Sequence, residues 1–588
     1  MEKLVKLLEK ELADAFETAG YDPALAKVTV SNRPDLCEYQ CNGAMAGAKA
    51  CHKPPLIIAQ DVVAKLSGSD VLSDVEAVRP GFINFNVAGS FLADYLSGLL
   101  DDPRLGVAKN NVPKKLFMDY GGPNVAKPLH VGHLRSAIIG ESIKRIARFM
   151  GDEVISDIHL GDWGLQMGLI ITELHHRHPE LPYFDESFEG DYPQEAPFTI
   201  AELEEIYPCA SGKSKEDEAY RAEAMEATHQ MQEGRRGYLA LWKHILSVSV
   251  ADLRKNYEKL DVSFDLWKGE SDVQKYIPQM IDDMKAKGLA YEDAGALIVD
   301  VKDEKDAKEV PPCILLKSDG ASLYTTTDLA TLVERQKDYA PDEILYIVDK
   351  RQDLHFVQVF RCAKKAGIVP EETVLTFLGF GTMNGKDGKP FKTRDGGVMR
   401  LENLIREIEE EMFRKIVENK SVKDTDAGKT AQQVGLAAIK YGDLSNQATK
   451  DYVFDVDRFT SFEGNTGPYL LYTIVRIKSI LARSARDGEA DGAGAVLAPS
   501  VESEKALMLS LALFGQAMET AYQEKAPHKL CAYLYELSNA FNRFYHETKI
   551  LTEEDLSRKA SFLQLLHLSL RTLETGIDLL GFSAPDRM

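Results

Sequence analysis

A glycine-rich turn between a short apolar strand and an amphipathic helix limits most strictly how this sequence can fold. Residues 115–118 form an apolar run long enough for one buried strand. Beyond the turn, apolar residues recur at helical spacing: Leu134, Ile138, Ile139, Ile143, Ile146, Ala147 and Met150. This order predicts an open α/β sheet of parallel strands, in which ligands bind beyond the carboxyl ends of the strands. The free amides at the helix N-terminus favour an anionic ligand there.

The turn carries two histidines, His130 and His133, with Gly132 between them. An imidazole can donate a hydrogen bond to a phosphoryl or ring oxygen, and a glycine lets the backbone approach a ligand closely. We therefore expect a nucleotide site, and the alternative is a turn with two incidental histidines. A zinc site is the weaker interpretation, because no third ligand follows at the spacing of a finger or a metalloprotease.

Length and composition indicate a soluble protein of several domains. A chain of 588 residues is too long for one core, so roughly three or four domains are expected. The sequence has no uninterrupted apolar run of the roughly 20 residues that a membrane span needs. Residues 1–14 have a charged helical pattern rather than that of a secretory signal. Seven scattered cysteines fit a reducing cytoplasm, and the cluster Cys37, Cys41, Cys51 and His52 is interpreted as buried thiols rather than a zinc site.

The net charge of −22 excludes one class of function and leaves another open. A protein that coats phosphate backbones nonspecifically needs an excess of cations, which this chain lacks. An enzyme that grips one folded RNA through a few local basic patches is still compatible, because the field that a ligand meets is local.

Polar side chains follow the second predicted strand, at residues 154–158. The turn after it, 159–164, contains two glycines with Asp162 and Trp163. Its place at a strand's carboxyl end is suitable for lining a ligand site. Structural packing of Trp163 is an equal alternative.

A second group of polar residues surrounds the third strand, at 344–348. A helix opens at Tyr324, and Asp328 lies near its start, where it either caps the helix or serves a ligand. Gln352 and His355 come just after the strand. A fourth strand, at 374–378, then leads into a glycine-rich loop at 385–397, which contains four glycines with interleaved cations. This loop either closes over phosphates or forms a solvated hairpin.

We expect four segments from shifts in pattern. Residues 1–110 form a small α/β domain, and 111–385 the sheet domain with a charged helical insertion at about 179–271. Residues 386–445 connect to a helical region at 446–588.

The apolar pattern also predicts three further elements. The pattern predicts a helix at 61–66, a strand at 291–301 and one helix at 501–522.

Several motifs resemble those of arginyl-tRNA synthetases, in class I of the aminoacyl-tRNA synthetases. Residues 123–136, Pro-Asn-Val-Ala-Lys-Pro-Leu-His-Val-Gly-His-Leu-Arg-Ser, resemble the first ATP-binding motif of that family. The Gly-Asp-Trp-Gly turn at 161–164 is similar to the family's turn after its second strand. Segments within 32–85 resemble its N-terminal extension, which leans against the tRNA near the D-loop. Residues 465–469 resemble the opening of its anticodon-binding bundle, so the resemblance covers the whole chain.

The resemblance implies a fold and a set of site residues. The fold is a Rossmann-like parallel sheet with an insertion, a small N-terminal α/β domain and a C-terminal all-helical bundle. The implied arginine-binding residues are Asp119, Asn124, Tyr324, Asp328 and Gln352. The implied ATP-binding residues are His130, Gly132, His133 and His355, and the groups expected to act on the phosphates are His130, His133, Lys127, Lys392 and Arg394.

The sequence departs from the family pattern at two places. In the loop expected to hold the second ATP motif, Pro390 stands where a lysine is usual and the methionine is missing. Gly121 and Gly122 replace the common serines of the first turn, which removes any side-chain contact from them.

The implied reaction is the ATP-dependent activation of L-arginine and its transfer to tRNA(Arg). Mg²⁺ is expected to accompany ATP without a dedicated protein site, and we expect a cytoplasmic monomer that does not bind membranes. Residues of base-stacking or hydrogen-bonding type in the last helices are Tyr533, Asn539, Asn542, Arg543 and Tyr545. One alternative is a small-molecule amide ligase on the same fold, and the other is a noncatalytic RNA-binding relative.

Overall fold

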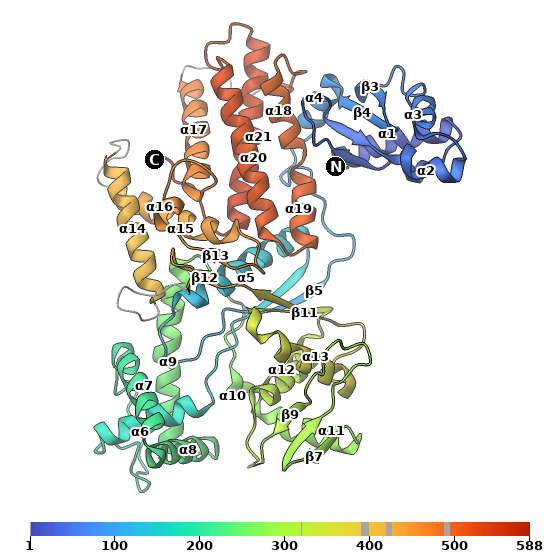
Figure 1. Cartoon of the computed structure of the whole chain (residues 1–588). Helices are drawn as coiled ribbons and strands as arrows, with labels where there is room; N and C mark the ends of the chain where they lie inside the picture. Colours follow the sequence, from blue (N-terminus) through green and yellow to red (C-terminus); the bar gives the residue numbers. More distant parts are fainter. Residues whose placement is uncertain (1, 319, 390–398, 419–425, 487–493) are drawn as a thin grey trace.

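A four-stranded parallel sheet lies at the centre of the molecule (Figure 1). The computed structural model describes residues 2–318, 320–389, 399–418, 426–486 and 494–588. The strand order in the sheet is β11, β10, β5, β6. The strands are β5 (Lys115–Tyr120), β6 (Glu153–Asp157), β10 (Glu343–Asp349) and β11 (Val374–Phe380).

Alternate side chains of the central strands face two separate cores. Met118 of β5 and Ile347 of β10 pack in the core that includes α5 (Val131–Met150). Phe117 and Tyr346 pack on the other side, against α12 (Tyr324–Tyr339) and α13 (Asp353–Ala366). Apolar side chains on both faces explain why these strands read as continuous hydrophobic runs.

The path of the chain fixes where a ligand can bind. From β5 the chain passes through α5 to β6 on one side of β5, and later enters β10 on its other side. The order of the strands therefore reverses between β5 and β10. In open parallel sheets, ligands bind outside the carboxyl ends of the strands at such a reversal.

The segment between β6 and β10 holds two groups of elements. The helices of the insertion are α6 (Leu165–Arg177), α7 (Ile200–Glu216), α8 (Glu218–Gln232) and α9 (Arg236–Lys259). After them come α10 (Glu270–Val273), η2 (Gln274–Tyr276), α11 (Ile277–Ala286), β7 (Ala290–Asp293), β8 (Ala296–Val299) and β9 (Cys313–Leu316). The 3-10 turn η3 (Lys350–Gln352) lies between β10 and α13.

The predicted strand at 291–301 is wrong as a single strand. It is a hairpin of β7 and β8, and β9 adds an antiparallel third strand. Ala294 and Gly295 turn the chain with φ of 49° and 84°. Two consecutive residues with positive φ make the tight turn that suits the twist of a hairpin.

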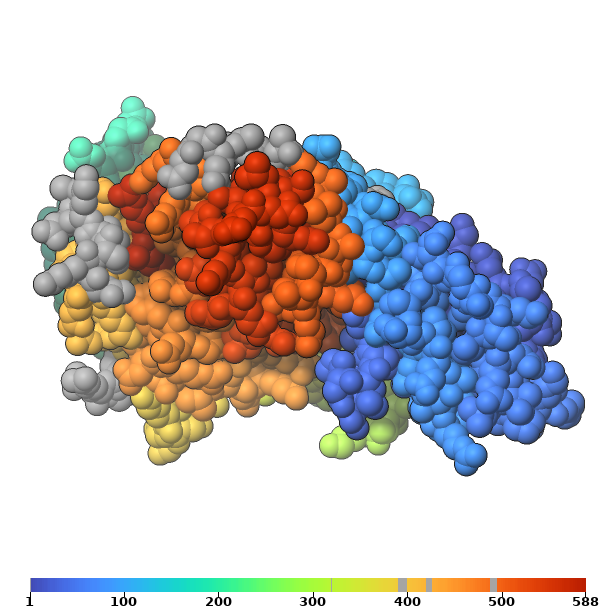
Figure 2. Space-filling model, turned by 90° about the horizontal axis from the view of Figure 1, so that it is seen from above, coloured from blue at the N-terminus to red at the C-terminus, as the bar shows by residue number. Residues whose placement is uncertain are grey.

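The N-terminal domain is a separate lobe beside the C-terminal helices (Figure 2). Its sheet has the order β1, β2, β4, β3. The elements are α1 (Leu4–Thr18), η1 (Pro23–Leu25), β1 (Val28–Val30), β2 (Tyr39–Cys41), α2 (Gly43–Cys51), α3 (Pro55–Val63), β3 (Leu72–Val78), β4 (Phe82–Val87) and α4 (Gly89–Ser97). The helix predicted at 61–66 instead begins at Pro55, a residue suited to the first turn of a helix. An ion pair of 2.7 Å joins Glu38 to Lys505 of the C-terminal region.

The C-terminal part is helical apart from a two-stranded pairing of β12 (Met383–Asn384) and β13 (Tyr452–Val453). The helices are α14 (Leu401–Glu418), α15 (Ala427–Leu444), α16 (Val456–Phe459), α17 (Gly467–Arg486), α18 (Glu502–Ala512), α19 (Phe514–Gln523), α20 (Pro527–Glu547) and α21 (Leu556–Leu579). The single helix predicted at 501–522 is therefore two, interrupted at Leu513. Within the described ranges, none of the helices has the length and apolar character of a membrane span.

A buried ion pair fastens the helical part to the sheet domain. Arg135 of α5 donates to the Asp443 carboxylate of α15 at 3.0 Å, and both side chains are at most 2% exposed. The same guanidinium donates to the carbonyls of Gly381 at 2.6 Å and Lys450 at 3.1 Å. Tyr452 donates its hydroxyl to Asp443 at 2.8 Å. Helix α5 thus carries the histidine turn at one end and this junction one turn further on.

We expect Asp443→Ala to destabilise the protein by about 3–5 kcal/mol, because it leaves the buried Arg135 guanidinium without its carboxylate. The measurement is the urea midpoint of the first unfolding transition, followed by tryptophan fluorescence. Arg351→Ala is the matched control, since it removes half of an exposed ion pair with Asp349. Its expected effect is below about 1 kcal/mol. Equal shifts for the two variants would contradict a structural role for the Arg135–Asp443 pair.

Candidate active site

The predicted site residues follow the carboxyl ends of β5, β6 and β10. The two loops after β5 and β6 are joined by backbone pairing. Val125 donates to the Gly161 carbonyl at 3.1 Å, and Gly161 donates to the Pro123 carbonyl at 3.2 Å. Asn124 lies in this pairing, and a side chain at Gly161 would collide with the Asn124 amide. The glycine is therefore required where the loops meet.

The two histidines form a pair at the N-terminus of α5. The Nδ1 atom of His130 accepts a hydrogen bond from the Gly132 amide at 3.0 Å, and Nδ1 of His133 accepts from the His130 amide at 3.2 Å. Their ring centroids are 3.9 Å apart. A Cβ atom on Gly132 would lie 2.8 Å from the His130 ring. Both rings therefore keep Nε2–H as the donor available to a ligand.

Both imidazoles are neutral at pH 7. Removal of water by the surrounding protein lowers the pKa of His133 to about 3, and the nearby His130 and Lys127 contribute. The same desolvation and the Lys127 charge lower the pKa of His130. Neutral rings can offer hydrogen bonds to an anionic ligand, but they carry no positive charge.

Lys127 and the residues after the glycine-rich loop also meet at the histidine turn. The Lys127 ammonium lies 4.6 Å from the ring centroid of Tyr207 on α7. Val131 donates to the Met399 carbonyl at 3.1 Å, and Leu401 donates to the Leu129 carbonyl at 2.9 Å. The segment that follows the loop is thus anchored on the turn.

The predicted loop cations Lys392 and Arg394 lie outside the described residues.

The Asp119 carboxylate is paired with a buried guanidinium. Arg335 of α12 donates to the carboxylates of Asp119 at 2.5 Å and of Asp157 at 3.1 Å. His159 lies against Asp157, with Nδ1 3.4 Å from a carboxylate oxygen. Burial opposes protonation of His159, but the neighbouring Asp157 carboxylate raises its pKa to about 9. Asp119 is therefore already paired with a cation of the protein itself.

Asp328 does not cap α12. The N-cap is Leu323, whose amide donates to the Thr326 hydroxyl at 3.0 Å. Asp328 instead accepts a hydrogen bond of 2.5 Å from Nε2 of His355. The capping alternative is excluded, and Asp328 remains as a partly exposed carboxylate at the sheet edge.

Glu270 is a further candidate site residue, which the sequence pattern did not indicate. It opens α10, and no cation pairs with its carboxylate within the part of the chain that the structure describes. Burial, opposed by His159 and reinforced by the charges of Asp328 and Asp162, raises its pKa to about 7. Glu270 and Asp328 are therefore near enough to interact electrostatically, and in the described part of the chain neither is paired with a lysine or an arginine, an arrangement that suits a cationic ligand.

Tyr324 and Gln352 are exposed at the same edge. Tyr324 opens α12 and is 68% exposed. Loss of water around its hydroxyl, followed by the charge of Glu270 and the nearby Tyr207 phenol, raises its pKa. Gln352 precedes α13 as its N-cap residue. Both side chains are accessible to a ligand.

Asp162 and Trp163 hold neighbouring elements in place. The Asp162 carboxylate accepts from the Ser271 amide at 3.0 Å and the Ser271 hydroxyl at 2.6 Å, so it fixes α10. The Trp163 ring packs edge-on against Trp242 of α9, with centroids 5.2 Å apart. For Trp163 the structural alternative is the one observed. Asp162 thereby also fixes the position of Glu270, the first residue of α10.

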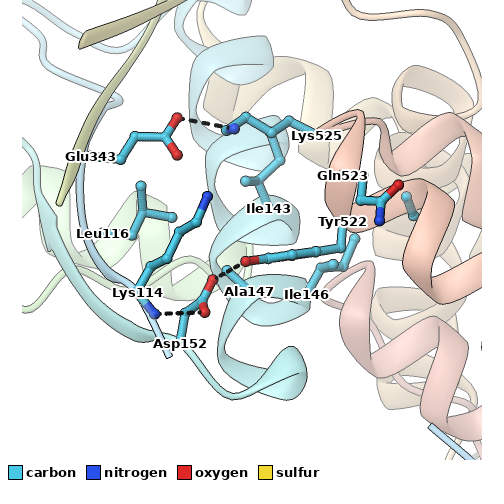
Figure 3. Close-up of a pocket in the computed structure, with 11 residues that line it drawn as sticks. Lys114, Leu116, Ile143, Ile146, Ala147, Asp152, Glu343, Tyr522, Gln523 and Lys525 are labelled. Carbon is cyan, nitrogen blue, oxygen red and sulfur yellow. Dashed lines mark hydrogen bonds and ion pairs between the residues drawn. The ribbon is translucent and has the colours of Figure 1, made fainter. Parts of the chain in front are cut away.

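A cavity of about 180 Å³ lies at the opposite, amino edge of the sheet (Figure 3). Figure 3 shows Tyr522 of α19 pointing to Asp152, its hydroxyl 2.5 Å from a carboxylate oxygen, and Lys525 pointing to Glu343 at 3.0 Å. These contacts join the amino ends of the strands to the helical part. The cavity therefore belongs to a domain interface rather than to the candidate active site.

Three family models match the chain. They are "tRNA synthetases class I (R), catalytic domain" over residues 96–456, "DALR anticodon binding domain" over 470–588 and "Arginyl tRNA synthetase N terminal domain" over 2–87.

Relatives named arginine–tRNA ligase match the full chain. The protein of Agathobacter rectalis is 61% identical and that of Alkaliphilus oremlandii 55% identical, each over 100% of both chains. Two solved arginyl-tRNA synthetases share the fold. The structure from Plasmodium falciparum has a TM-score of 0.80 at 24% identity over 100% of both chains. The one from Thermus thermophilus has 0.78 at 24% identity, over 99% of this chain and 100% of that chain.

These matches confirm the predicted fold class and the resemblance drawn from the motifs. Since full-length relatives reach 61% identity and the catalytic family model spans residues 96–456, the chain belongs to the arginyl-tRNA synthetases of class I.

Proposed function

We propose that the chain activates L-arginine with ATP and esterifies it to the 3′ end of tRNA(Arg). The observation that carries this proposal is the pair of carboxylates Asp328 and Glu270 at the same sheet edge as the His130–His133 pair. A cationic group is suited to the first pair and a polyphosphate to the second. Arginine–tRNA ligase activity of the full-length relatives supports the same reaction.

The proposed chemistry needs position and charge rather than a protein nucleophile. A carboxylate oxygen of arginine attacks the α-phosphorus of ATP, the bond to the bridging oxygen breaks, and pyrophosphate leaves. A hydroxyl of the terminal tRNA ribose then attacks the arginyl carbonyl and releases AMP. Holding the reactants in line and neutralising charge on the leaving group supply the rate.

At the guanidinium end, we propose that Asp328 and Glu270 accept hydrogen bonds from the substrate. A planar guanidinium donates in a fixed fork, which two acceptor oxygens match. His355 then positions Asp328, although its assignment to ATP stays a prediction. Tyr324, Gln352 and Asn124 stay predicted contacts to arginine, and Asp119 acts through its ion pair with Arg335.

At the phosphate end, we propose that His130 and His133 donate Nε2–H to ATP and that Gly132 admits the phosphates closely. Lys127, Lys392 and Arg394 would neutralise the departing pyrophosphate. Mg²⁺ is expected to arrive bound to ATP oxygens. Among the described residues, no cluster of three or more His, Cys, Asp or Glu side chains would hold it independently.

For tRNA, we propose that a groove between α17 and the end of α20 receives unpaired bases. The groove has a volume of about 530 Å³ and is lined by aromatic and basic side chains. The Arg476 guanidinium lies over the rings of Tyr472 at 4.6 Å and Tyr545 at 5.3 Å. Exposed rings with a neighbouring cation are suited to stacking on bases.

The other predicted base-binding residues have structural contacts. Asn542 accepts from Arg476 at 2.6 Å and donates to the Tyr469 hydroxyl at 2.9 Å. Tyr469 donates to Asn539 at 2.8 Å, and Tyr533 donates to the Ser510 carbonyl at 3.0 Å. Arg543 pairs with Glu547 and Glu502. These contacts favour Tyr545 over the others as a base-stacking residue.

We also propose a cytoplasmic monomer, a compartment in which the seven free cysteines stay reduced.

The experiment that tests the proposal is arginine-dependent exchange of pyrophosphate into ATP, with and without tRNA(Arg), followed by charging of that tRNA. A small-molecule amide ligase would exchange pyrophosphate without charging tRNA. A noncatalytic RNA-binding relative would do neither.

We expect Asp328→Ala to raise the KM for arginine by at least about 10²-fold. The variant leaves the bound guanidinium of the substrate without this carboxylate, and such a loss costs about 3–5 kcal/mol. The KM for ATP should change little. Asp328→Asn should fail as well, since its amide offers one acceptor oxygen where the guanidinium fork needs two. Asp338→Ala, at an exposed position of the same helix, is the matched control. A near-normal arginine KM in Asp328→Ala would leave Asp328 as a partner of His355 alone.

A second expectation concerns pH. Because the pKa of Glu270 is raised to about 7, its carboxyl is mostly protonated at about pH 6 and ionised at about pH 8. Arginine stays cationic over this range, so its KM should fall about tenfold as the pH rises. Glu270→Gln should remove the dependence and keep the KM high. A pH dependence that survives in Glu270→Gln would belong to another group.

A third expectation separates the fixed and loop cations. We expect Lys127→Ala to lower kcat of single-turnover adenylate formation by about 10²–10³-fold, as for one preorganised charge-stabilising group. Lys392→Ala should cost less, because Pro390 displaces the usual motif lysine. A near-normal Lys127→Ala enzyme beside an inactive Lys392→Ala enzyme would return the role to the loop.

A further inference from the structure

Helix α7 of the insertion has one side in the insertion core and another at the histidine turn. Leu203, Ile206 and Ala210 are buried against the neighbouring helices. Glu204 and Tyr207 lie three residues apart and so share one face of the helix. Each contacts a cation that belongs to the ATP-binding segments.

The ring of Tyr207 contacts the ammonium of Lys127. The 4.6 Å separation from the ring centroid is within the range of an attractive cation–π interaction. In the described part of the chain, no carboxylate forms an ion pair with Lys127. The ring therefore restrains the lysine without neutralising its charge.

Glu204 ties α7 to the same turn at a second point. Its carboxylate accepts from Arg400 at 2.6 Å, and the Glu204 side chain is 13% exposed. Arg400 lies in the short antiparallel bridge with His130. The position of α7 relative to the histidines is thus fixed by an ion pair one turn away from Tyr207.

Tyr207 also lies near the arginine side of the site. Its phenol contributes to the raised pKa of Tyr324, after loss of water and the charge of Glu270. The Tyr207 ring therefore contacts Lys127 and lies near enough to Tyr324, the first residue of α12, to interact with it electrostatically. Such a place permits one side chain of the insertion to influence phosphate chemistry without touching the reacting atoms.

We propose that Tyr207 is a positioning residue, whose ring holds Lys127 at the histidine turn in readiness for the phosphates of ATP. This inference rests on the proposed role of Lys127 and deepens it. The aromatic ring is the active part, and the hydroxyl is not needed. When ATP binds, its phosphate oxygens attract the Lys127 ammonium. In the described part of the chain Lys127 has no ion pair that must break first.

A purely structural role must be separated from this one, because Tyr207 also packs against the small cluster of Leu169, Ala210, Tyr220 and Ala224. The test is therefore a double-mutant cycle in single-turnover adenylate formation by the full-length enzyme, with Tyr207→Leu and Lys127→Ala alone and combined. Coupling between the two sites measures whether one residue acts through the other.

We expect Tyr207→Leu to lower kcat by about 5- to 30-fold, the range of a partly desolvated cation–π contact. The KM for arginine should stay unchanged. Tyr207→Phe keeps the ring and should restore the rate. In the Lys127→Ala background, Tyr207→Leu should have no further effect.

The matched control is Tyr192→Leu. Tyr192 lies in the same insertion, and its ring contacts Arg236 at 5.7 Å rather than Lys127. A loss equal to that of Tyr207→Leu would indicate damage to the insertion and overturn the inference. Additive effects of Tyr207→Leu and Lys127→Ala, or failure of Tyr207→Phe, would also overturn it. A near-normal Lys127→Ala enzyme would overturn both the inference and the proposed role of Lys127, whereas tRNA charging by the wild type tests the overall reaction separately.

Discussion

The buried guanidinium of Arg335 is the contact on which the geometry of the site depends. It reaches from α12 to the carboxylates of Asp119 and Asp157, at the ends of two neighbouring strands. Asp328 lies seven residues earlier on the same helix, so the anchor that fixes Arg335 also fixes Asp328. A buried charge is stable in this position because two carboxylates and the rings of Phe117 and Tyr346 surround it. The protein thus uses one of its own arginines to set the place where the substrate arginine is expected.

That internal ion pair also decides which acids remain for the substrate. Asp119 and Asp157 are paired with Arg335, and Asp162 is committed to Ser271. Glu270 and Asp328 remain, and neither is paired with a lysine or arginine in the described part of the chain. A lysine ammonium would satisfy them as a point charge, whereas a planar guanidinium matches both with directed hydrogen bonds. The pairing of Arg335 therefore leaves two acids without a lysine or arginine partner in the described part of the chain, which favours a guanidinium over an ammonium as the ligand.

The sequence predicted the structural features that depend on local pattern. It did not predict those that depend on contacts between residues far apart in the chain. The strand–turn–helix around His130 follows from apolar spacing and a required Gly132, and the structure confirms both. Glu204 belongs to a charged run that reads as a solvated helix face, yet its side chain turns to Arg400, nearly 200 residues away. Glu270 gave no signal, because its environment is assembled from the neighbouring segments that carry Asp162 and Asp328. The apolar pattern at 501–522 is continuous, so it did not reveal that this segment forms two helices interrupted at Leu513.

The protein has a net charge of −22, yet its expected substrates, ATP and tRNA, are polyanions. The contacts that hold each cation therefore decide whether that cation is available to a substrate. Lys127 is held by the Tyr207 ring, and Arg476 by the rings of Tyr472 and Tyr545 with the Asn542 amide. In the described residues, neither is paired with a carboxylate, unlike Arg543, which is paired with Glu502 and Glu547. A cation that leaves an aromatic ring for a phosphate forfeits a weak contact for a charge-assisted one, whereas one that leaves a carboxylate must first break an ion pair. Aromatic and amide partners thus keep positive charge in place and available at the two surfaces where ATP and unpaired bases are expected to bind.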